Sequence, residues 1–294
     1  MTGRVIKFYN SFFFVKVDEE LLPCKLRGLM KRDKRSGSAV CPGDFVEVEK
    51  LNDGTGLIKQ VYNRKNLLQR PLVANINQVI LTFAAAQPDL HSLLLNRFLI
   101  LAEWSNIDEI IICVNKIDLI DNAEKFLTDY ERLYKIIRVS ALNGNGIDEL
   151  KNLMTNKVSV LTGASGVGKS SILNAIDPSL NLKIGKVSEK IKRGKNTTRI
   201  SELIPFAGGF LVDTPGFSAV DLVDAGIDVK SLGNCFKEFN QFAPKCKFTG
   251  CSHSHEPDCA VKSAVDDNEI LNERYQAYLS MLKEINEGKK PKYG

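Results

Sequence analysis

Gly163-Ala164-Ser165-Gly166-Val167-Gly168-Lys169-Ser170-Ser171 lies near the middle of the chain and decides how the largest part of it folds. The stretch fits the pattern G-x-x-x-x-G-K-[ST]. The apolar run Val158–Leu161 precedes it, and a helix-like segment, Ser171–Ile176, follows it. A strand, a glycine-rich loop and a helix in this order indicate a P-loop. Its backbone N–H groups and the positive end of the helix then face a phosphate chain.

Two side chains of this loop carry specific expectations. Lys169 should reach the β- and γ-phosphates, and Ser170 should offer its hydroxyl to Mg²⁺. A glycine- and serine-rich turn that binds nothing is the alternative, but the flanking strand and helix favour the P-loop. We expect all nine residues to contact the nucleotide: Gly163, Ala164, Ser165, Gly166, Val167, Gly168, Lys169, Ser170 and Ser171.

A second motif, Asn115-Lys116-Ile117-Asp118, directly follows the predicted strand Glu109–Val114. It fits N-K-x-D. The Asp118 carboxylate can accept hydrogen bonds from N1–H and N2–H₂ of guanine, whereas adenine has an acceptor and no amino group there. A buried carboxylate left without a partner costs more than one good hydrogen bond gains, which provides the discrimination. We expect Asn115 to tie this loop to the P-loop and the Lys116 stem to cover the base.

Two further loops follow predicted strands. Ser140-Ala141-Leu142 comes after the strand Ile136–Val139, and a backbone N–H there can meet guanine O6. Asp213-Thr214-Pro215-Gly216 closes the strand Gly209–Val212, which places Asp213 near Mg²⁺ and the Gly216 N–H near the γ-phosphate.

The basic segment Lys190–Arg199 lies between the P-loop and Asp213. A threonine here is the expected second hydroxyl on Mg²⁺, and we choose Thr198 over Thr197. Each of these residues alone could be an ordinary turn or cap residue. Together, at strand ends in one alternating α/β region, they predict a site for a guanine nucleotide, because ligands bind outside the carboxyl ends of parallel strands.

The order of the motifs is unusual. The base-reading motifs at 115–118 and 140–142 precede the P-loop at 163–171, whereas an ordinary GTPase domain starts with its P-loop. Domain termini often lie close together, so a circular permutation can preserve the site while moving the chain ends. We therefore predict a circularly permuted α/β P-loop GTPase domain over 69–222.

Residues 1–68 read as five short strands separated by turns, which predicts a small OB-fold β barrel. This region holds 13 Lys/Arg and 8 Asp/Glu and so accounts for the whole net charge of +5. A basic loop can bind RNA phosphates, although the same composition also suits a solvated loop. The candidate RNA-binding residues are Arg27, Lys31, Arg32, Lys34 and Arg35.

The C-terminal region contains Cys246-x₄-Cys251-x-His253-x₅-Cys259. Three thiolates and one imidazole form a closed set for one structural Zn²⁺, and the short spacing lets one loop wrap a tetrahedral ion. Cys235 and His255 are possible substitutes, and unliganded thiols are the alternative. We predict a mostly helical zinc-binding domain over 223–294, with its helical part at about Asp267–Glu287.

The 294 residues contain no run near the ~20 apolar residues of a membrane span and no apolar core of a signal peptide. We therefore expect a cytoplasmic, monomeric, multidomain protein without a membrane partner.

The arrangement of these motifs resembles the bacterial RsgA family, also called YjeQ or YloQ. The resemblance rests on the permuted order of Asn115–Asp118, Gly163–Ser171 and Asp213–Gly216, and on the zinc motif, and it spans essentially the whole chain. It implies a GTPase that hydrolyses GTP to GDP, binds the 30S ribosomal subunit and its 16S rRNA, acts late in subunit maturation, and is stimulated by the subunit.

The sequence departs from common GTPases at the catalytic water. Phe217 stands where a water-orienting Gln often follows the Asp-x-x-Gly turn, and Asn196 stands where the family typically carries a histidine. Asn can hydrogen-bond water but cannot act as a base near neutral pH. A nucleotide-gated RNA-binding module, acting on another RNA with little dependence on hydrolysis, is the alternative function.

Overall fold

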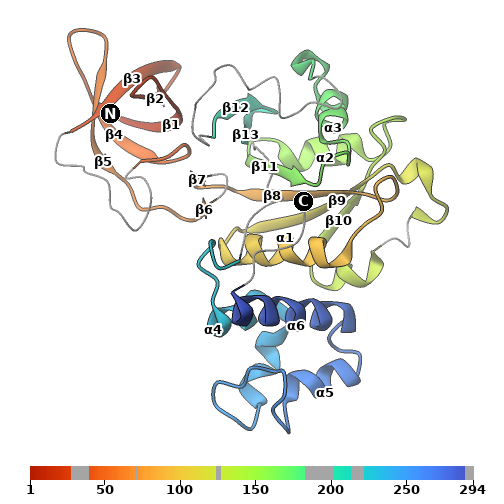
Figure 1. The fold of residues 1–294 in the computed structure, drawn as a ribbon. Coiled ribbons are helices and arrows are strands. Elements are labelled where there is room, and N and C mark those ends of the chain that lie inside the picture. Colours follow the sequence, from red (N-terminus) through yellow and green to blue (C-terminus); the bar gives the residue numbers. More distant parts are fainter. Residues whose placement is uncertain (28–39, 70–71, 124–126, 183–200, 213–221, 289–294) are drawn as a thin grey trace.

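The computed structural model describes residues 1–27, 40–69, 72–123, 127–182, 201–212 and 222–288. They form an N-terminal barrel, a central sheet with helices on both faces, and a mostly helical C-terminal part (Figure 1). Among the described residues, no helix combines the length and apolar character needed to cross a membrane.

The N-terminal part is a closed barrel of five strands, as predicted. Val5, Val15, Leu22, Val46 and Ile58 fill its interior. They alternate with more exposed neighbours, which is the pattern of a strand with one buried face. In the order β1-β2-β3-β5-β4, the strands are β1 (Thr2–Tyr9), β2 (Phe12–Val17), β3 (Glu20–Leu26), β5 (Gly56–Val61) and β4 (Phe45–Lys50).

A short hairpin connects the barrel to the central sheet. Its strands are β6 (Leu67–Gln69) and β7 (Leu72–Ala74). The Asn66 side chain holds the exit of this hairpin, because its Nδ2 donates to Ile76 O at 2.8 Å and its Oδ1 accepts from Ile76 N at 2.8 Å. This hairpin was not among the predicted elements.

The central sheet has six strands in the order β10-β9-β8-β11-β13-β12, and all are parallel except the edge strand β12. Every residue of β8 is buried, as a central strand covered on both faces requires. The strands are β8 (Gln78–Ala84), β9 (Glu109–Asn115), β10 (Lys135–Arg138), β11 (Val158–Gly163), β12 (Leu203–Phe206) and β13 (Gly209–Val212).

Helices cover both faces of this sheet. Helix α1 (Ser92–Trp104) lies on one face, and α2 (Ile147–Met154) and α3 (Lys169–Ile176) lie on the other (Figure 1). The parallel strands therefore present all their carboxyl ends, and the loops that follow them, at one edge.

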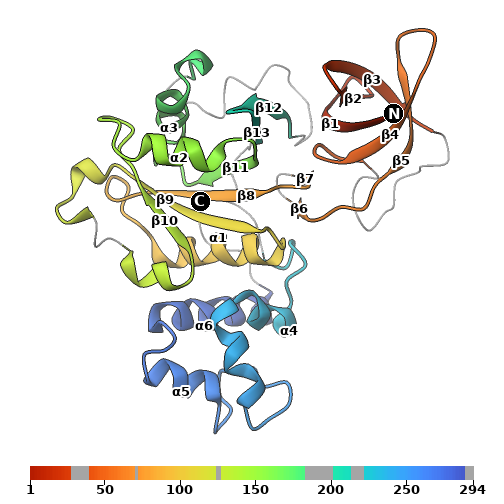
Figure 2. The same cartoon turned by 180° about the vertical axis from the view of Figure 1, so that it is seen from behind.

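The C-terminal part packs against the outer side of α1 (Figure 2). Its helices are α4 (Val229–Leu232), α5 (Ala260–Asp266) and α6 (Asn272–Glu287). The short 3₁₀ helices of the described residues are η1 (Ile117–Leu119), η3 (Thr128–Arg132), η4 (Pro178–Leu180), η6 (Gly233–Cys235), η7 (Lys237–Gln241) and η8 (Ala243–Lys245).

Two arginine–carboxylate pairs fix α6 in place. The buried Arg274 guanidinium donates to both Glu238 oxygens, at 2.7 and 2.9 Å, and to Asn96 Oδ1 of α1 at 3.0 Å. Arg97 of α1 also donates to Glu284 at 3.0 Å. Buried charges need such partners. Asn96 and Arg97, which interrupt the apolar run of α1, therefore mark the contact between α1 and α6.

Two predicted helices are wrong in detail. The sequence pattern of Ala123–Leu133 predicts an α-helix, but the described part of that segment forms η3, which buries Tyr130 before the chain turns into β10. The helix predicted at about Asp267–Glu287 begins later, at Asn272, because a turn with Asn268 at φ 59° precedes α6. A separate helix that was not predicted, α5, ends at Asp266 before this turn.

Candidate functional site

The P-loop joins β11 to α3 and needs glycine at two positions for space as well as for backbone angle. A Cβ on Gly163, at φ 151°, would lie 2.0 Å from Thr82 O of β8. A Cβ on Gly168, at φ 93°, would lie 2.3 Å from Asn115 Nδ2. Both contacts are closer than any side chain tolerates, so the loop lies directly on its neighbouring strands.

Lys169 begins α3, and its side chain curls back over the loop. Its Nζ donates to Gly163 O at 2.8 Å and to Ala164 O at 2.6 Å. Burial lowers the pKa of this ammonium to about 8. A desolvated cation held by two carbonyls gains by meeting an anion, which fits a phosphate group at this loop.

The Ser170 hydroxyl is buried, and its Oγ has no hydrogen-bond partner among the described residues. A buried hydroxyl without a partner is costly, so the position calls for an additional group. An oxygen ligand beside a phosphate site suits Mg²⁺. The residues at this point therefore fit a magnesium ion.

Asn115, the last residue of β9, connects three loops. Its Nδ2 donates to Val167 O of the P-loop at 2.9 Å, which is the contact expected from the sequence. Its Oδ1 accepts from Ala141 N, in the loop after β10, at 3.1 Å. The side chain is buried. One amide thus holds the N-K-x-D loop, the Ser140-Ala141 loop and the P-loop in one arrangement.

The Asp118 carboxylate is supported from the next loop. Ser140 is fully buried, and its Oγ donates to Asp118 Oδ1. Asp118 itself is exposed, because it projects from η1 at the edge of the sheet. This exposure differs from the buried carboxylate expected from the sequence. Any penalty for the wrong base therefore arises only when a bound base covers Asp118.

Lys116 takes the left-handed conformation, at φ 63°, and its Nζ donates to Gln87 O. Gln87 and Pro88 follow β8, and the Pro88 ring lies 3.7 Å from where a Cβ on Gly166 would stand. This segment therefore lies between the N-K-x-D loop and the P-loop. Sequence reasoning missed it, because Ala85–Pro88 matches no motif and only its place after a central strand could have indicated it.

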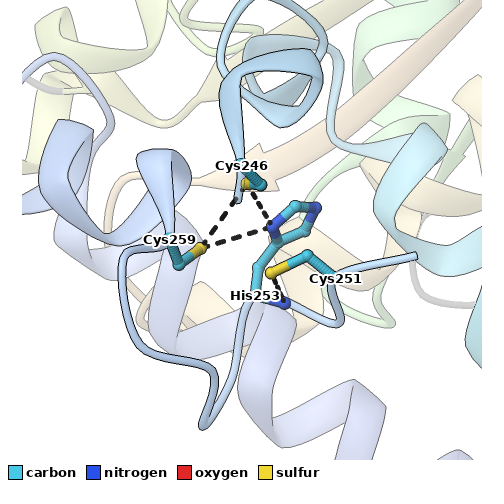
Figure 3. Close-up of side chains that lie close together, drawn as sticks. All are labelled: Cys246, Cys251, His253 and Cys259. Carbon is cyan, nitrogen blue, oxygen red and sulfur yellow. Dashed lines mark hydrogen bonds between the residues drawn. The ribbon is translucent and has the colours of Figure 1, made fainter. Parts of the chain in front are cut away.

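The second cluster lies in the C-terminal part (Figure 3). The ligand atoms of Cys246, Cys251, His253 and Cys259 all lie within 4.8 Å of one another. Cys246 Sγ lies 3.9 Å from Cys259 Sγ, and His253 Nδ1 lies 3.5 and 3.4 Å from these two sulfurs. A tetrahedral Zn²⁺ with ordinary bond lengths separates two sulfurs by about 3.8 Å and a sulfur from a nitrogen by about 3.6 Å.

The protonation chemistry of the cluster also suits a cation. Burial lowers the pKa of His253, which favours the neutral imidazole that ligates metals. Burial raises the pKa of the Cys251 thiol to about 12, so its thiolate forms only beside a positive charge. The four side chains therefore fit one zinc ion, as predicted. Cys235 and His255 lie outside the group.

Surrounding residues hold the loop that carries these side chains. The hydroxyls of Tyr275 and Tyr278, on α6, donate to His253 O at 2.8 Å and to Ser252 O at 2.6 Å. The Glu256 carboxylate accepts from Ser252 N at 2.7 Å. The cluster is thereby tied to α6 and, through α6, to α1.

Comparisons with known proteins show which family the chain resembles. A family model described as RsgA GTPase matches residues 61–223, and a model described as RsgA N-terminal domain matches residues 2–58.

The chain belongs to the RsgA GTPase family.

Relatives named "Small ribosomal subunit biogenesis GTPase RsgA" match along nearly the whole chain. The relative from Caldanaerobacter subterraneus subsp. tengcongensis is 38% identical, with 99% of this chain and 98% of the relative covered. The relative from Clostridium acetobutylicum is 43% identical, with 97% and 98% covered.

Two solved structures share the RsgA-type fold. YjeQ from Thermotoga maritima matches with a TM-score of 0.82 and 37% identity, over 98% of this chain and 99% of that chain. YloQ, described as a circularly permuted GTPase, matches with a TM-score of 0.78 and 34% identity, over 99% and 96%. The motif order in this chain is therefore the permuted order of a GTPase domain.

Several predicted RsgA-type site residues lie outside the described part of the chain. They are Asn196, Thr198, Asp213 and Gly216 of the nucleotide site, and Lys31, Arg32, Lys34 and Arg35 of the basic loop. Arg27 is described and exposed at the end of β3, where its N–H donates to Ile58 O at 3.3 Å.

Proposed function

We propose that this chain is a GTPase that binds the 30S ribosomal subunit and assists its late maturation. It hydrolyses GTP to GDP and phosphate, and the subunit stimulates this reaction. The observation that carries the proposal is the Asn115 junction, because it joins the loop that would read a base to the loop that would hold phosphates. The small ribosomal subunit is proposed as the partner because the names of the full-length relatives mention its biogenesis.

In the proposed site, Asp118 accepts two hydrogen bonds from guanine and Ser140 fixes its orientation. The backbone of Ala141 faces O6, and the Lys116 stem covers the base plane. The P-loop, from Gly163 to Ser171, surrounds the phosphates with its N–H groups, and Lys169 leaves its two carbonyls to meet phosphate charge.

Mg²⁺ bound with GTP would offset the charge of the phosphates. Ser170 and Thr198 would supply its hydroxyl ligands, Asp213 would lie close by, and the Gly216 N–H would face the γ-phosphate. Asn196 is the candidate for orienting the attacking water, because Phe217 cannot hydrogen-bond it. If Asn196 does not orient this water, the ribosome supplies the group that does.

We propose one structural zinc on Cys246, Cys251, His253 and Cys259. The chain has three domains in this proposal. Residues 1–68 bind RNA, residues 69–222 bind the nucleotide, and residues 223–294 bind zinc. Arg27, Lys31, Arg32, Lys34 and Arg35 would contact phosphates of 16S rRNA. The protein acts as a monomer in the cytoplasm, where bacterial ribosomal subunits mature.

The experiment that tests this function compares GTP turnover with and without purified 30S subunits, using tRNA as a control RNA. Turnover that rises with the subunit and not with tRNA supports the proposal. Tight RNA binding with turnover that no RNA changes favours the alternative, a nucleotide-gated RNA-binding module.

A further inference from the structure

The barrel contacts the GTPase domain at one end of its central sheet, where β1 lies beside β12 and β13 in both views (Figures 1 and 2). Lys7 of β1 forms an ion pair with Glu202, just before β12, at 2.8 Å. Since β12 is an edge strand, the contact with β1 lies at an edge of the central sheet.

Arg4, also on β1, is the centre of this contact. Its guanidinium lies 4.6 Å from the ring centre of Phe45 in the barrel and 5.8 Å from that of Phe210 in β13. It donates to Gly43 O at 3.4 Å and to Asn75 O at 3.0 Å. One side chain therefore joins the barrel, the connection after the β6–β7 hairpin, and the sheet of the GTPase domain.

The strand that Arg4 contacts is held tightly on its other side. Phe210 pairs with Val158 of β11, the strand that leads into the P-loop. A Cβ on Gly209 would lie 2.1 Å from Lys157 O, so the β12–β13 hairpin lies directly on the start of β11. Arg4 therefore contacts a strand that is paired with β11 on its other side.

The place of these contacts in the sequence gives them a consequence. Phe210 lies three residues before Asp213, and Glu202 lies four residues after Thr198. Both ends of the β12–β13 hairpin therefore continue directly into the residues that the proposed function assigns to the γ-phosphate and Mg²⁺. A cleft of about 270 Å³ lies beside Arg4 and is also lined by Lys16 and Phe45.

We propose that Arg4 and the Lys7–Glu202 pair are positioning residues that couple binding of the ribosomal subunit by the barrel to hydrolysis of GTP. This inference rests on the proposed function. A half-exposed ion pair contributes little by itself, so Arg4, with its two hydrogen bonds and two ring contacts, carries the larger part.

The test uses the full chain with Arg4→Ala, Lys7→Glu, Glu202→Lys and the double charge swap. For each variant, turnover is measured without subunits and at saturating 30S, together with affinity for GTP and for 30S. We expect Arg4→Ala to keep basal turnover and GTP affinity while its stimulation falls at least about fivefold, the lower range of coupling between sites. Each single charge reversal should lower stimulation about two- to threefold, and the double swap should restore it.

The Lys50–Glu20 pair of the barrel, at 2.6 Å, provides the matched control, because it lies away from the β1 contact with the GTPase domain. Lys50→Glu should leave stimulation unchanged. The coupling is refuted if Arg4→Ala is fully stimulated at saturating 30S, or if the double swap behaves no better than the single reversals. If circular dichroism shows that Arg4→Ala does not fold, the coupling is tested by comparing the double charge swap with the single reversals. A wild-type protein without stimulation would instead refute the proposed function.

Discussion

At the scale of single residues, the nucleotide site depends on a few side chains that bridge loops. The Asn115 amide uses a donor and an acceptor, and each is satisfied by the backbone of a different loop. Ser140 in turn holds one oxygen of Asp118 and leaves the carboxylate accessible. The loops are therefore arranged around the carboxylate that is proposed to read the base.

This arrangement predicts that Asp118 determines the base. Asp118→Asn should weaken binding of GTP and favour xanthosine triphosphate, whose C2 carbonyl accepts a hydrogen bond where guanine donates one. Competition between the two nucleotides for a fluorescent analogue measures the preference. Asp121→Asn, an exposed carboxylate three residues away, is the control and should change nothing. An Asp118→Asn protein that still prefers GTP would show that another group reads the base.

Lys169 and Ser170 carry the second prediction at this scale. Lys169→Ala removes the cation proposed to meet phosphate charge, and Ser170→Ala removes the hydroxyl proposed to bind Mg²⁺, which has no hydrogen-bond partner among the described residues. Loss of one preorganised group lowers turnover by a factor on the order of 10²–10³. Single-turnover hydrolysis measures the effect, with the exposed Lys151→Ala as control. Near-normal turnover in either variant would remove that residue from the site.

At the scale of elements, the sequence predicted the strands and helices with strong patterns and missed those set by tertiary contacts. The barrel strands, β9, β11 and β13 follow from short apolar runs bounded by turns. The β6–β7 hairpin was missed because strands of three residues show little periodicity. Helix α5 was missed because it is short and begins directly after Cys259 of the Cys₃His cluster. Gln87 and Arg4 were missed because only the folded chain brings them to their partners.

The Cys₃His cluster gives a prediction for the C-terminal elements. Protein purified without chelator should contain one zinc per chain by elemental analysis, because the ligand atoms already stand at the separations of a tetrahedral ion. Cys251→Ala should lose zinc and the ordered structure around 235–265, while nucleotide binding persists, since no P-loop or guanine-loop residue lies there.

His255→Ala is the matched control for this prediction, because His255 is exposed and lies outside the cluster. It should retain zinc and the thermal stability of the unmodified chain. Zinc-free protein, or zinc that is lost with His255 and not with Cys251, would contradict the assignment of ligands.

At the scale of the whole molecule, the barrel and the C-terminal part hold the GTPase domain from two sides. The net positive charge lies in residues 1–68, so binding to an RNA surface should weaken steeply with salt. Replacing Lys31, Arg32, Lys34 and Arg35 together by Ala should flatten the logarithmic dependence of 30S affinity on salt by about 0.7–0.9 per lost phosphate contact. An unchanged slope would place the RNA contacts elsewhere.

The central claim is that the small ribosomal subunit completes the hydrolytic site. Phe217 cannot orient water and Asn196 cannot act as a base, so the free protein should turn over GTP at about 10⁻⁴ to 10⁻² s⁻¹, as unassisted GTPases do. A catalytic group supplied by a partner is worth on the order of 10³–10⁵ in turnover.

The measurement that tests this claim most directly is steady-state phosphate release at saturating GTP and low salt, with and without purified 30S subunits. We predict a rise of at least about tenfold with 30S, and no rise with an equal mass of tRNA. If Asn196→Ala is stimulated as strongly as the unmodified chain, the subunit or bound water supplies the missing group. Equal turnover with and without 30S subunits would contradict the account.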